Sequence, residues 1–380
     1  MRYYALRNDF HGEERKRVVK RLVGLKESLS ERVPAKIFNE NVLIATWNIR
    51  DFDSNKFRYG PREKESFYYI AEILSSFDLI AIQEVNEDLY AFKRLMYILG
   101  GRWDYIMTDV TEGRSGNKER MAYVYDTNRI SFKKLAGEIV LADRKKIEDE
   151  RQFARTPFLV AFQSGWFKFK LCTVHIYYGS SSGEKLERRI EEISTIAETL
   201  SKRAEKYDEN LILLGDFNIV SPEHETMKAL EDNGFMIPDA IKEAPSNMYQ
   251  TKHYDQIAFK EKEDEIQLGE NENSAGVYNL YNRVFATRQF EEYRAVVIKS
   301  LDNKIAYQEE RLAEENDNDK KDKIRERIAE FEHIKADDVE LKDYYKKEWR
   351  TFQMSDHLPM WTELKINFSM SYLNRIKNEG

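Results

Sequence analysis

The stretch "LILLGDFNIV", which spans Leu211–Val220, places a polar pair directly after a run of apolar residues. Consecutive apolar side chains of this kind are typical of a strand that is buried on both faces. Gly215, Asp216 and Asn218 are ordinary turn residues, so the simplest interpretation of the strand end is a turn. The second interpretation is a site, because residues two apart in an extended chain face the same way.

The composition indicates a large hydrophobic core and a net negative charge. The 380 residues are 41% hydrophobic, which suits one large domain or two small ones. The net charge of −7 argues against a protein that holds nucleic acid through a broad basic surface. An enzyme that contacts a few phosphates locally remains compatible with this charge.

Cys172 is the one cysteine, so neither an internal disulfide nor a cysteine-based zinc site is available. Its apolar surroundings, "FKLCTVH", indicate a buried structural thiol. The start of the chain lacks the apolar segment of a secretory signal, and no run approaches the length of a membrane span. We therefore expect a cytoplasmic protein without a membrane span.

Apolar patterning predicts strands and helices that interleave without strict alternation. The predicted strands lie at 42–49, 78–85, 121–126, 158–162, 169–176, 211–217, 254–259 and 358–366, and the predicted helices at 61–77, 89–101, 184–206 and 223–235. This order favours an α/β (α+β) domain with mixed sheets over a doubly wound parallel sheet.

Helical spacing at both ends of the chain suggests additional segments. We predict an N-terminal helical extension within 1–38, a catalytic domain over 39–370 and a tail over 371–380. Within the catalytic domain, two helical stripes separated by "NDND" predict an inserted helical hairpin over 289–350. The hairpin has charged outer faces, and its length suggests a protein partner or self-association.

Chemically capable side chains border six of the predicted strands. They are Asn48, Glu84, His175, Asp216 with Asn218, Asp255, and Asp356 with His357. In a mixed sheet, the ends of some strands and the starts of others share one edge, so we expect these groups to converge. One such strand end would mean little, but six are difficult to ascribe to turn chemistry alone.

The residue types at these borders suit metal-assisted hydrolysis. The carboxylates of Glu84, Asp216 and Asp356 are hard oxygen ligands that favour Mg²⁺, Mn²⁺ or Ca²⁺ over zinc. Two histidines beside carboxylates can act as acid and base. No nucleophile elbow is present and Cys172 lacks an evident base, so the chemistry points to water attacking a phosphate ester.

The ordered motifs resemble the endonuclease/exonuclease/phosphatase superfamily, with the closest likeness to deoxyribonuclease I-like nucleases. The series runs "TWNIR", "AIQEV", "ERMAYVYD", "TVHI", "LLGDFN", "YDQI" and "SDHLPM". The resemblance covers about Asn41–Asn367 apart from the hairpin. It implies a four-layer sandwich of two mixed β-sheets flanked by helices, and metal-dependent hydrolysis of phosphodiesters or phosphomonoesters.

The resemblance also implies roles for individual residues. Glu84 would be the principal metal ligand, with Asn48 in support and Asp356 at this metal or a second one. Mg²⁺ is the expected ion, with Mn²⁺ as an alternative and Ca²⁺ as an assisting ion. Asp216 would position or deprotonate the attacking water, and Asn218 would hold the phosphate.

The histidines and Arg155 complete the implied site. His357 would contact the scissile phosphate as part of an acid–base pair, with His175 as a second histidine facing the phosphate. In the deoxyribonuclease I-like pattern, Asp255 would serve His175 and Glu119 would serve His357. Other branches pair the Asp255 equivalent with the final histidine. Arg155 in "ARTPF" matches an arginine that binds phosphate.

Each of these residues also has a structural interpretation when it is taken singly. Asn48 could be a strand-end cap, Glu84 a surface residue and Arg155 part of an ordinary loop. The remaining histidines are, by default, solvated or packed: His11, His224, His253 and His333. The ordered set as a whole favours the hydrolase.

The substrate is the part that the sequence specifies least. The "HYDQI" segment departs from inositol-phosphate phosphatases, and "GDFN", "YDQI" and a histidine at 175 suit nuclease branches. Asn86 and Glu87 stand where the deoxyribonuclease I-like pattern has a groove-reading arginine. The leading hypothesis is a Mg²⁺-dependent endonuclease that hydrolyses DNA. The alternatives are a phosphatase or phospholipid phosphodiesterase, and a catalytically silent interaction protein that uses the hairpin.

Overall fold

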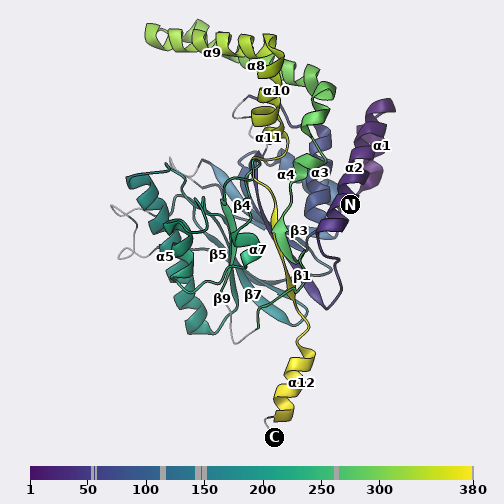
Figure 1. Cartoon of the computed structure of the whole chain (residues 1–380), viewed down its shortest axis with the longest axis vertical. Helices are drawn as coiled ribbons and strands as arrows, with labels where there is room; N and C mark the ends of the chain where they lie inside the picture. The colour runs from purple at the N-terminus through teal and green to yellow at the C-terminus, as the bar shows by residue number, and fades with distance from the viewer. Residues whose placement is uncertain are drawn as a thin grey trace.

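The computed structural model describes residues 1–52, 55, 58–111, 117–141, 147, 152–260 and 265–378. The last two residues of the predicted tail lie outside this set. Two β-sheets packed face to face form the centre of the molecule, and helices cover their outer faces (Figure 1). The predicted four-layer sandwich of two mixed sheets is confirmed.

The first sheet has the strand order β10-β12-β1-β2-β4-β3, and β11 also pairs with β12. Its strands are β1 (Asn41–Phe52), β2 (Leu79–Asn86), β3 (Trp103–Met107), β4 (Glu119–Asp126), β10 (Gln267–Leu268), β11 (Ala275–Val277) and β12 (Met360–Lys365). β1 and β2 run parallel, and the other pairings are antiparallel.

The second sheet has the order β5-β6-β7-β8-β9. Its strands are β5 (Ser131–Glu138), β6 (Phe158–Ser164), β7 (Phe167–His175), β8 (Leu211–Asp216) and β9 (Asp255–Lys260). Here β7 and β8 form the parallel pair, between antiparallel neighbours. Each sheet therefore places one parallel pair near its centre.

Helices, short turns and loops connect the strands. The helices are α1 (Leu6–Asp9), α2 (Gly12–Arg32), α3 (Lys64–Ser75), α4 (Tyr90–Leu99), α5 (Glu184–Tyr207), α6 (Glu225–Glu231), α7 (Asp239–Lys242), α8 (Phe290–Glu314), α9 (Asn318–Ala336), α10 (Asp338–Tyr344), α11 (Arg350–Gln353) and α12 (Ser369–Asn378). Short 3₁₀ turns are η1 (Tyr3–Ala5), η3 (Leu280–Asn282) and η4 (Thr287–Gln289), and η5 (Tyr345–Trp349) is a π-turn.

Alternation along β1 explains why its apolar run has no polar face. Val42 and Ile44 point into the core between the sheets, where they meet the apolar side chains of β6, β7 and β8. Leu43 and Trp47 point the other way, into a second core beneath α2, α3 and α4. Each apolar side chain on this strand is removed from water, which stabilises the fold by about 25 cal/mol per Å² of apolar surface buried.

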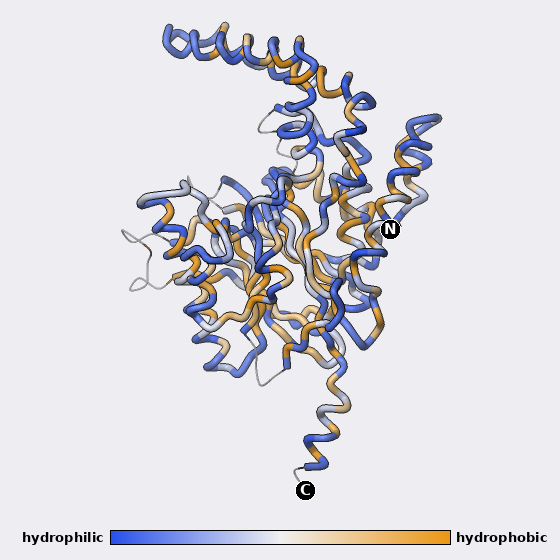
Figure 2. The backbone as a smooth tube through the Cα atoms, viewed as in Figure 1, coloured by the Kyte–Doolittle hydropathy of each residue, from blue (hydrophilic) through white to orange (hydrophobic). Residues whose placement is uncertain are grey.

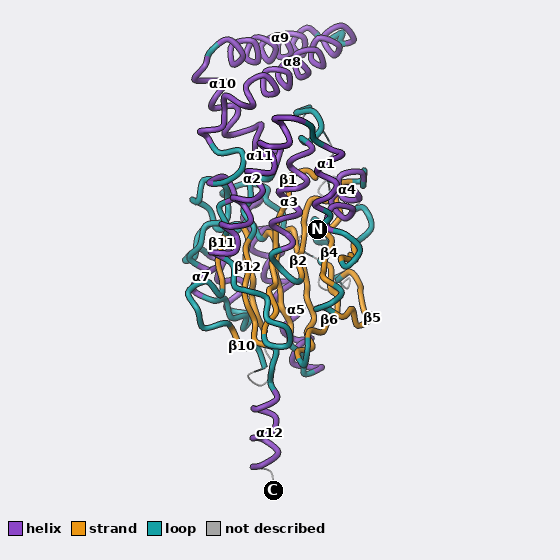
Figure 3. Tube along the Cα trace, turned by 90° about the vertical axis from the view of Figure 1, so that its right-hand side faces the viewer, coloured by secondary structure: helices purple, strands orange, loops and turns teal. Residues whose placement is uncertain are grey.

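The hairpin α8–α9 rises from one end of the sandwich, and α12 extends from the other (Figures 1 and 3). Figure 2 shows that the hairpin is mostly hydrophilic beyond its base. Asn41, at the start of β1, pairs with Lys365 just before α12. The later part of β1, which carries Asn48, therefore lies toward the hairpin. The chain then returns through α10, η5 and α11 directly to Asp356 and His357.

Candidate active site

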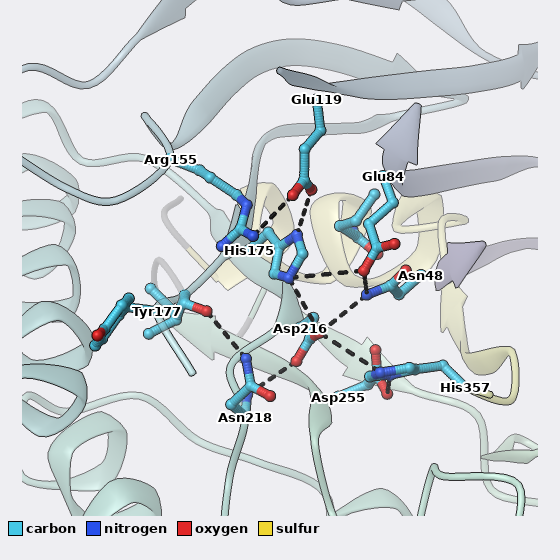
Figure 4. Close-up of polar contacts among 12 residues, drawn as sticks. Asn48, Glu84, Glu119, Arg155, His175, Tyr177, Asp216, Asn218, Asp255 and His357 are labelled. Atoms are coloured by element: carbon cyan, nitrogen blue, oxygen red, sulfur yellow. Dashed lines mark hydrogen bonds and ion pairs between the residues drawn. The ribbon is translucent and has the colours of Figure 1, made fainter. Parts of the chain in front are cut away.

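The two parallel strand pairs bring four of the predicted residues to one edge of the sandwich. Asn48 on β1 and Glu84 on β2 belong to one sheet, and His175 on β7 and Asp216 on β8 belong to the other. His175 and Asp216 stand directly opposite each other in register. Figure 4 shows these side chains facing one another across the gap between the sheets.

Asn48 links the two sheets at this point. Its Nδ2 donates to Glu84 Oε1 at 2.9 Å and to Asp216 Oδ2 at 3.0 Å. Its Oδ1 is buried and has no hydrogen-bond partner among the described residues. A buried amide oxygen without a partner is costly, so this atom is a candidate ligand for a cation beside the two carboxylates.

Asp216 closes the turn that follows its own strand. The backbone N–H of Asn218 donates to Asp216 Oδ1 at 2.9 Å, and Asn218 adopts a φ of 54°, which asparagine tolerates. Phe217 between them is fully buried. The segment therefore turns at Asn218 and leaves Asp216 Oδ2 facing His175 and His357, and the role of Asp216 and Asn218 in a site stays a prediction.

Glu84 reaches the site through an irregular backbone. Its φ is 62°. At this position the pairing of β2 is irregular with both neighbouring strands, β1 and β4. The backbone N–H of Asp51, itself at a φ of 47°, donates to Glu84 Oε2 at 2.7 Å. Such bulges redirect side chains and occur next to active sites, which fits a ligand role for Glu84.

Each histidine is held by one carboxylate through Nδ1. His175 Nδ1 lies 2.9 Å from Glu119 Oε2, and His357 Nδ1 lies 2.8 Å from Asp255 Oδ2. The two Nε2 atoms both face Asp216 Oδ2, at 3.5 Å from His175 and 3.7 Å from His357. The structure therefore contains two acid–histidine pairs directed at one carboxylate oxygen.

The predicted pairing of Asp255 with His175 and of Glu119 with His357 is wrong. Asp255 stands opposite Asp216 on β9, the strand on the far side of β8 from β7 and His175. His357 reaches Asp255 because its backbone pairs with Asn247 in the segment that leads into β9. Glu119 stands opposite Asn86 near Glu84, which places it beside His175.

The acid partners hold the histidines toward their charged forms. Burial and the charge of Arg155 lower the pKa of His175, but Glu119 and Asp216 outweigh them, and the net pKa lies above its ordinary value. Burial also lowers the pKa of His357, yet the carboxylates of Asp255 and Asp216 raise it well above the usual range. Both imidazoles are thus suited to hold a proton near neutral pH.

Glu119 connects His175 to Arg155. Burial alone would raise the pKa of Glu119, but the charges of His175 and Arg155 lower it to about 2. Arg155 Nη2 donates to Glu119 Oε1 at 2.7 Å, and the arginine is nine-tenths buried. The structure brings Arg155 to the site, where it holds Glu119; its predicted contact with phosphate stays a prediction.

Asp356 lies at the same edge and is half-buried beside His357. Burial raises the pKa of Glu84, and the negative charges of Glu119 and Asp356 raise it further. Several carboxylates converging without enough positive charge indicate a place for a cation. Glu84, Asp356 and the Asn48 amide oxygen supply the hard donors that Mg²⁺ or Mn²⁺ prefers, so these residues fit the predicted ion.

Three further residues, absent from the sequence prediction, position the site residues through hydrogen bonds to their main chains. Ser355 Oγ donates to Asn48 O at 2.6 Å and accepts from the backbone N–H of His357 at 3.0 Å. Ser246 Oγ accepts from the backbone N–H of Asp255 at 2.9 Å. Arg189 is almost fully buried and donates to Asn218 O at 3.0 Å. The "S" of "SDH" is a signal for Ser355; a lone serine and a helical arginine give none.

Comparisons with known proteins give matches in structure only. No protein-family model matches the chain, and no curated protein matches it. A solved endonuclease/exonuclease/phosphatase family protein from Bacteroides thetaiotaomicron is 16% identical, with 86% of this chain and 97% of that chain covered and a TM-score of 0.49. The chain is similar in fold to this solved protein.

Two further matches carry names that state a ligand or an activity. D. rerio TDP2, solved with a single-strand DNA product, is 10% identical, with 85% of this chain and 98% of that chain covered and a TM-score of 0.47. A B. thetaiotaomicron mannosyl-6-phosphatase is 18% identical, with 63% and 90% covered and a TM-score of 0.47. Within the described residues, no helix is long and apolar enough to cross a membrane.

Proposed function

We propose that this chain is a divalent-metal-dependent phosphoesterase, and that its substrates are phosphodiesters of nucleic acid, with DNA the leading candidate. The observation that carries the proposal is the convergence of two acid–histidine pairs on Asp216 Oδ2, beside the oxygen donors Glu84 and Asn48. Water attack on a phosphate ester needs a proton acceptor, a proton donor and compensation for developing negative charge.

Asp216 is the proposed acceptor for the proton of the attacking water. Its Oδ1 is occupied by the backbone of Asn218, so Oδ2 is the oxygen that faces the reaction. As the water oxygen bonds to phosphorus, its proton passes to Asp216 Oδ2. The bond from phosphorus to the leaving oxygen breaks in the same displacement.

His357 is the proposed donor of the proton that the leaving oxygen needs. Asp255 fixes the imidazole through Nδ1, which leaves Nε2 to contact the phosphate and to donate. His175, held in the same way by Glu119, presents a second Nε2 to the non-bridging oxygens. Asn218 is proposed to hold the phosphate from the β8 side.

Glu84, Asn48 and Asp356 are the residues that would hold the ion. A bound Mg²⁺ or Mn²⁺ would neutralise charge on the phosphate oxygens and polarise the phosphorus centre. The Glu84 carboxylate is already held in position, because the backbone N–H of Asp51 donates to its Oε2. Ca²⁺ is proposed only as an assisting ion.

A phosphatase that acts on small phosphate esters is the second candidate. Asn86, which stands where a groove-reading arginine would be expected, turns inward and donates from Nδ2 to Asp51 Oδ1 at 3.0 Å. Glu87 next to it is exposed and acidic. This side of the site thus offers little attraction for a second phosphate of a duplex.

The proposal extends to the cell compartment and to partners. Cys172 is a free, fully buried thiol, and burial raises its pKa. Because the sequence has this one cysteine and so no internal disulfide, we propose the cytoplasm as the compartment. The hairpin α8–α9 is proposed as a contact for a protein partner or a second copy, because its described surface beyond the base is mostly hydrophilic and exposed.

A nuclease assay tests the proposal. Supercoiled plasmid, single-stranded DNA and RNA are incubated with the full chain and Mg²⁺ or Mn²⁺, with and without a chelator. We expect metal-dependent nicking of DNA that is lost in His357→Ala and kept in His333→Ala, an exposed histidine of α9. Intact nucleic acids beside hydrolysis of a sugar or lipid phosphate would favour the phosphatase. Plasmid nicking by His357→Ala equal to wild type would assign the activity to a contaminant.

A further inference from the structure

The segment that follows His175 places two tyrosines at the edge of the site. Tyr177 points away from the histidines toward α5 (Figure 4), where the guanidinium of Arg188 lies 4.3 Å from its ring centre. Tyr178, the next residue, keeps 49% of its surface exposed. The mechanism proposed above gives Tyr178 no role, although its main chain lies beside that of Asn218.

Arg189 ties Tyr178 to the site. Its Nε donates to Tyr178 O at 3.0 Å and its Nη1 to Asn218 O at 3.0 Å, so one guanidinium bridges the two segments. The same group lies 4.7 Å from the centre of the Tyr178 ring and donates to Ser180 O at 2.5 Å. Because Arg189 is almost fully buried and makes these bonds, it holds the tyrosine in place before any ligand arrives.

A second tyrosine stands on the same side of the site. The ring of Tyr254 lies 5.4 Å from the imidazole of His357. The main-chain oxygen of Tyr254 accepts from the backbone N–H of Phe217 at 2.9 Å, one residue before Asn218. Tyr178, which Arg189 links to Asn218, and Tyr254, which contacts His357, therefore both border the groups that are proposed to hold the scissile phosphate.

We infer that Tyr178 is a specificity-determining residue whose exposed ring stacks on the base of the nucleotide adjoining the scissile phosphate. The inference rests on the proposed function and narrows its substrate class to esters that carry a nucleobase near the reacting phosphate. Stacking on an aromatic side chain tolerates any base, because every base has a π-face. The residue would thus contribute affinity and positioning without reading sequence.

The arginine behind the ring distinguishes a base from a sugar. A guanidinium is attracted to the negative face of the ring on which it lies. It pulls electron density toward that face, so the opposite face becomes poorer in electrons. The C–H groups of a sugar bind best to an electron-rich face, whereas a nucleobase is itself a π-system and stacks on a depleted one. The pairing of Arg189 with Tyr178 therefore favours a planar base over a sugar ring.

The test compares a short single-stranded oligonucleotide with versions that carry one abasic residue next to the cleaved bond. We expect Tyr178→Ala to raise KM for the intact oligonucleotide by about 5- to 100-fold with a smaller change in kcat. An abasic residue at the stacking position should raise KM for wild type by a similar factor and add little to Tyr178→Ala. Tyr178→Trp, which keeps a ring, should restore a KM close to that of wild type.

Tyr207→Ala is the matched control. Tyr207 is 54% exposed, and the guanidinium of Arg203 lies 5.3 Å from its ring centre. It is the last residue of α5 and lies near the start of β8, at the other end of that strand from Asp216. An unchanged KM in Tyr178→Ala, or equal losses on intact and abasic substrates, would overturn the inference. Failure of the wild type to cleave any oligonucleotide would instead overturn the proposed function.

Discussion

His357 is held by Asp255, whose Oδ2 lies 2.8 Å from Nδ1 of the imidazole. Asp255 is fully buried and starts the strand next to Asp216, so one pair of adjacent strands supplies both the acid that orients the histidine and the carboxylate that the histidine faces. Glu119 does the same for His175 from the other sheet. The two orienting acids thus come from different sheets, Glu119 from the first and Asp255 from the second.

The pairing predicts which double variants are non-additive. Asp255→Asn should lower kcat by about 10²- to 10⁴-fold, because the imidazole loses its orienting acid, and His357→Ala should do the same. The double variant should be scarcely worse than either single one, since the residues act as a unit. Glu119→Gln combined with His357→Ala should instead lose nearly the sum of both effects. Steady-state kinetics of the three single and two double variants check this, and additive losses for Asp255 with His357 would refute the pairing.

Arg155 is expected to matter for stability. Removing one partner of a buried ion pair leaves the other unpaired, so Arg155→Met should lower the free energy of unfolding by up to about 3–5 kcal/mol. Without the arginine, the pKa of Glu119 should also rise from its low value. Urea unfolding measures the stability loss. An unchanged unfolding curve together with a raised KM would show that Arg155 serves the phosphate directly.

Glu84 is expected to set the metal requirement. Glu84→Gln keeps the size of the side chain and removes the charge that binds a cation, so half-maximal activity should need about tenfold or more Mg²⁺ or Mn²⁺. Titration of Mn²⁺ by calorimetry measures the same loss without turnover. A metal titration that Glu84→Gln leaves unchanged would move the ligand assignment to Asp216 and Asp356.

Lys304 makes stability depend on pH above neutrality. Burial lowers its pKa from 10.5 to about 8, with Glu348 opposing the shift and Arg327 and Arg50 adding to it. Its Nζ lies 3.6 Å from the centre of the Tyr59 ring. Between these two pKa values the unfolded chain binds more protons than the folded one, so this group destabilises below pH 8 and its penalty disappears as the pH rises to 10.5.

The measurement compares wild type with Lys304→Met. Near pH 7.5 the methionine variant should be the more stable one, by up to roughly 3 kcal/mol, because it lacks the buried charge. The difference should shrink steadily toward pH 10. Lys299→Met on the same helix is exposed and should show no such trend. A difference between wild type and Lys304→Met that stays constant with pH would contradict the account.

Much of the sandwich could be predicted because its central strands are buried on both faces. β1 and β8 read as unbroken apolar runs that end in polar residues, and the structure places those residues together. The edge strand β5 was missed because its residues are mostly exposed and give no apolar alternation. Residues 371–380 were predicted only as a tail; residues 371–378 belong to α12, a helix with no buried residue, so its sequence has no core face to reveal it.

The histidine partners show what the motif order leaves open. Asp255 and Glu119 both border strands, and either could serve either histidine until the strand order is known. The pairing of β9 with β8 and of β4 with β2 determines which acid serves which histidine. Both pairings are contacts between parts of the chain that are distant in the sequence. Arg189 and Ser246 act through single hydrogen bonds to main-chain groups, which no local pattern records.

The most direct test of the central claim is the turnover of a simple phosphodiester, bis(4-nitrophenyl) phosphate, by wild type and Asp216→Asn with Mg²⁺, with Mn²⁺ and with a chelator. We expect metal-dependent turnover by wild type that the chelator abolishes. We also expect a fall in kcat of at least about 10²-fold in Asp216→Asn, with KM changed far less and the fold intact by circular dichroism. Equal kcat values for a folded Asp216→Asn and wild type would contradict it.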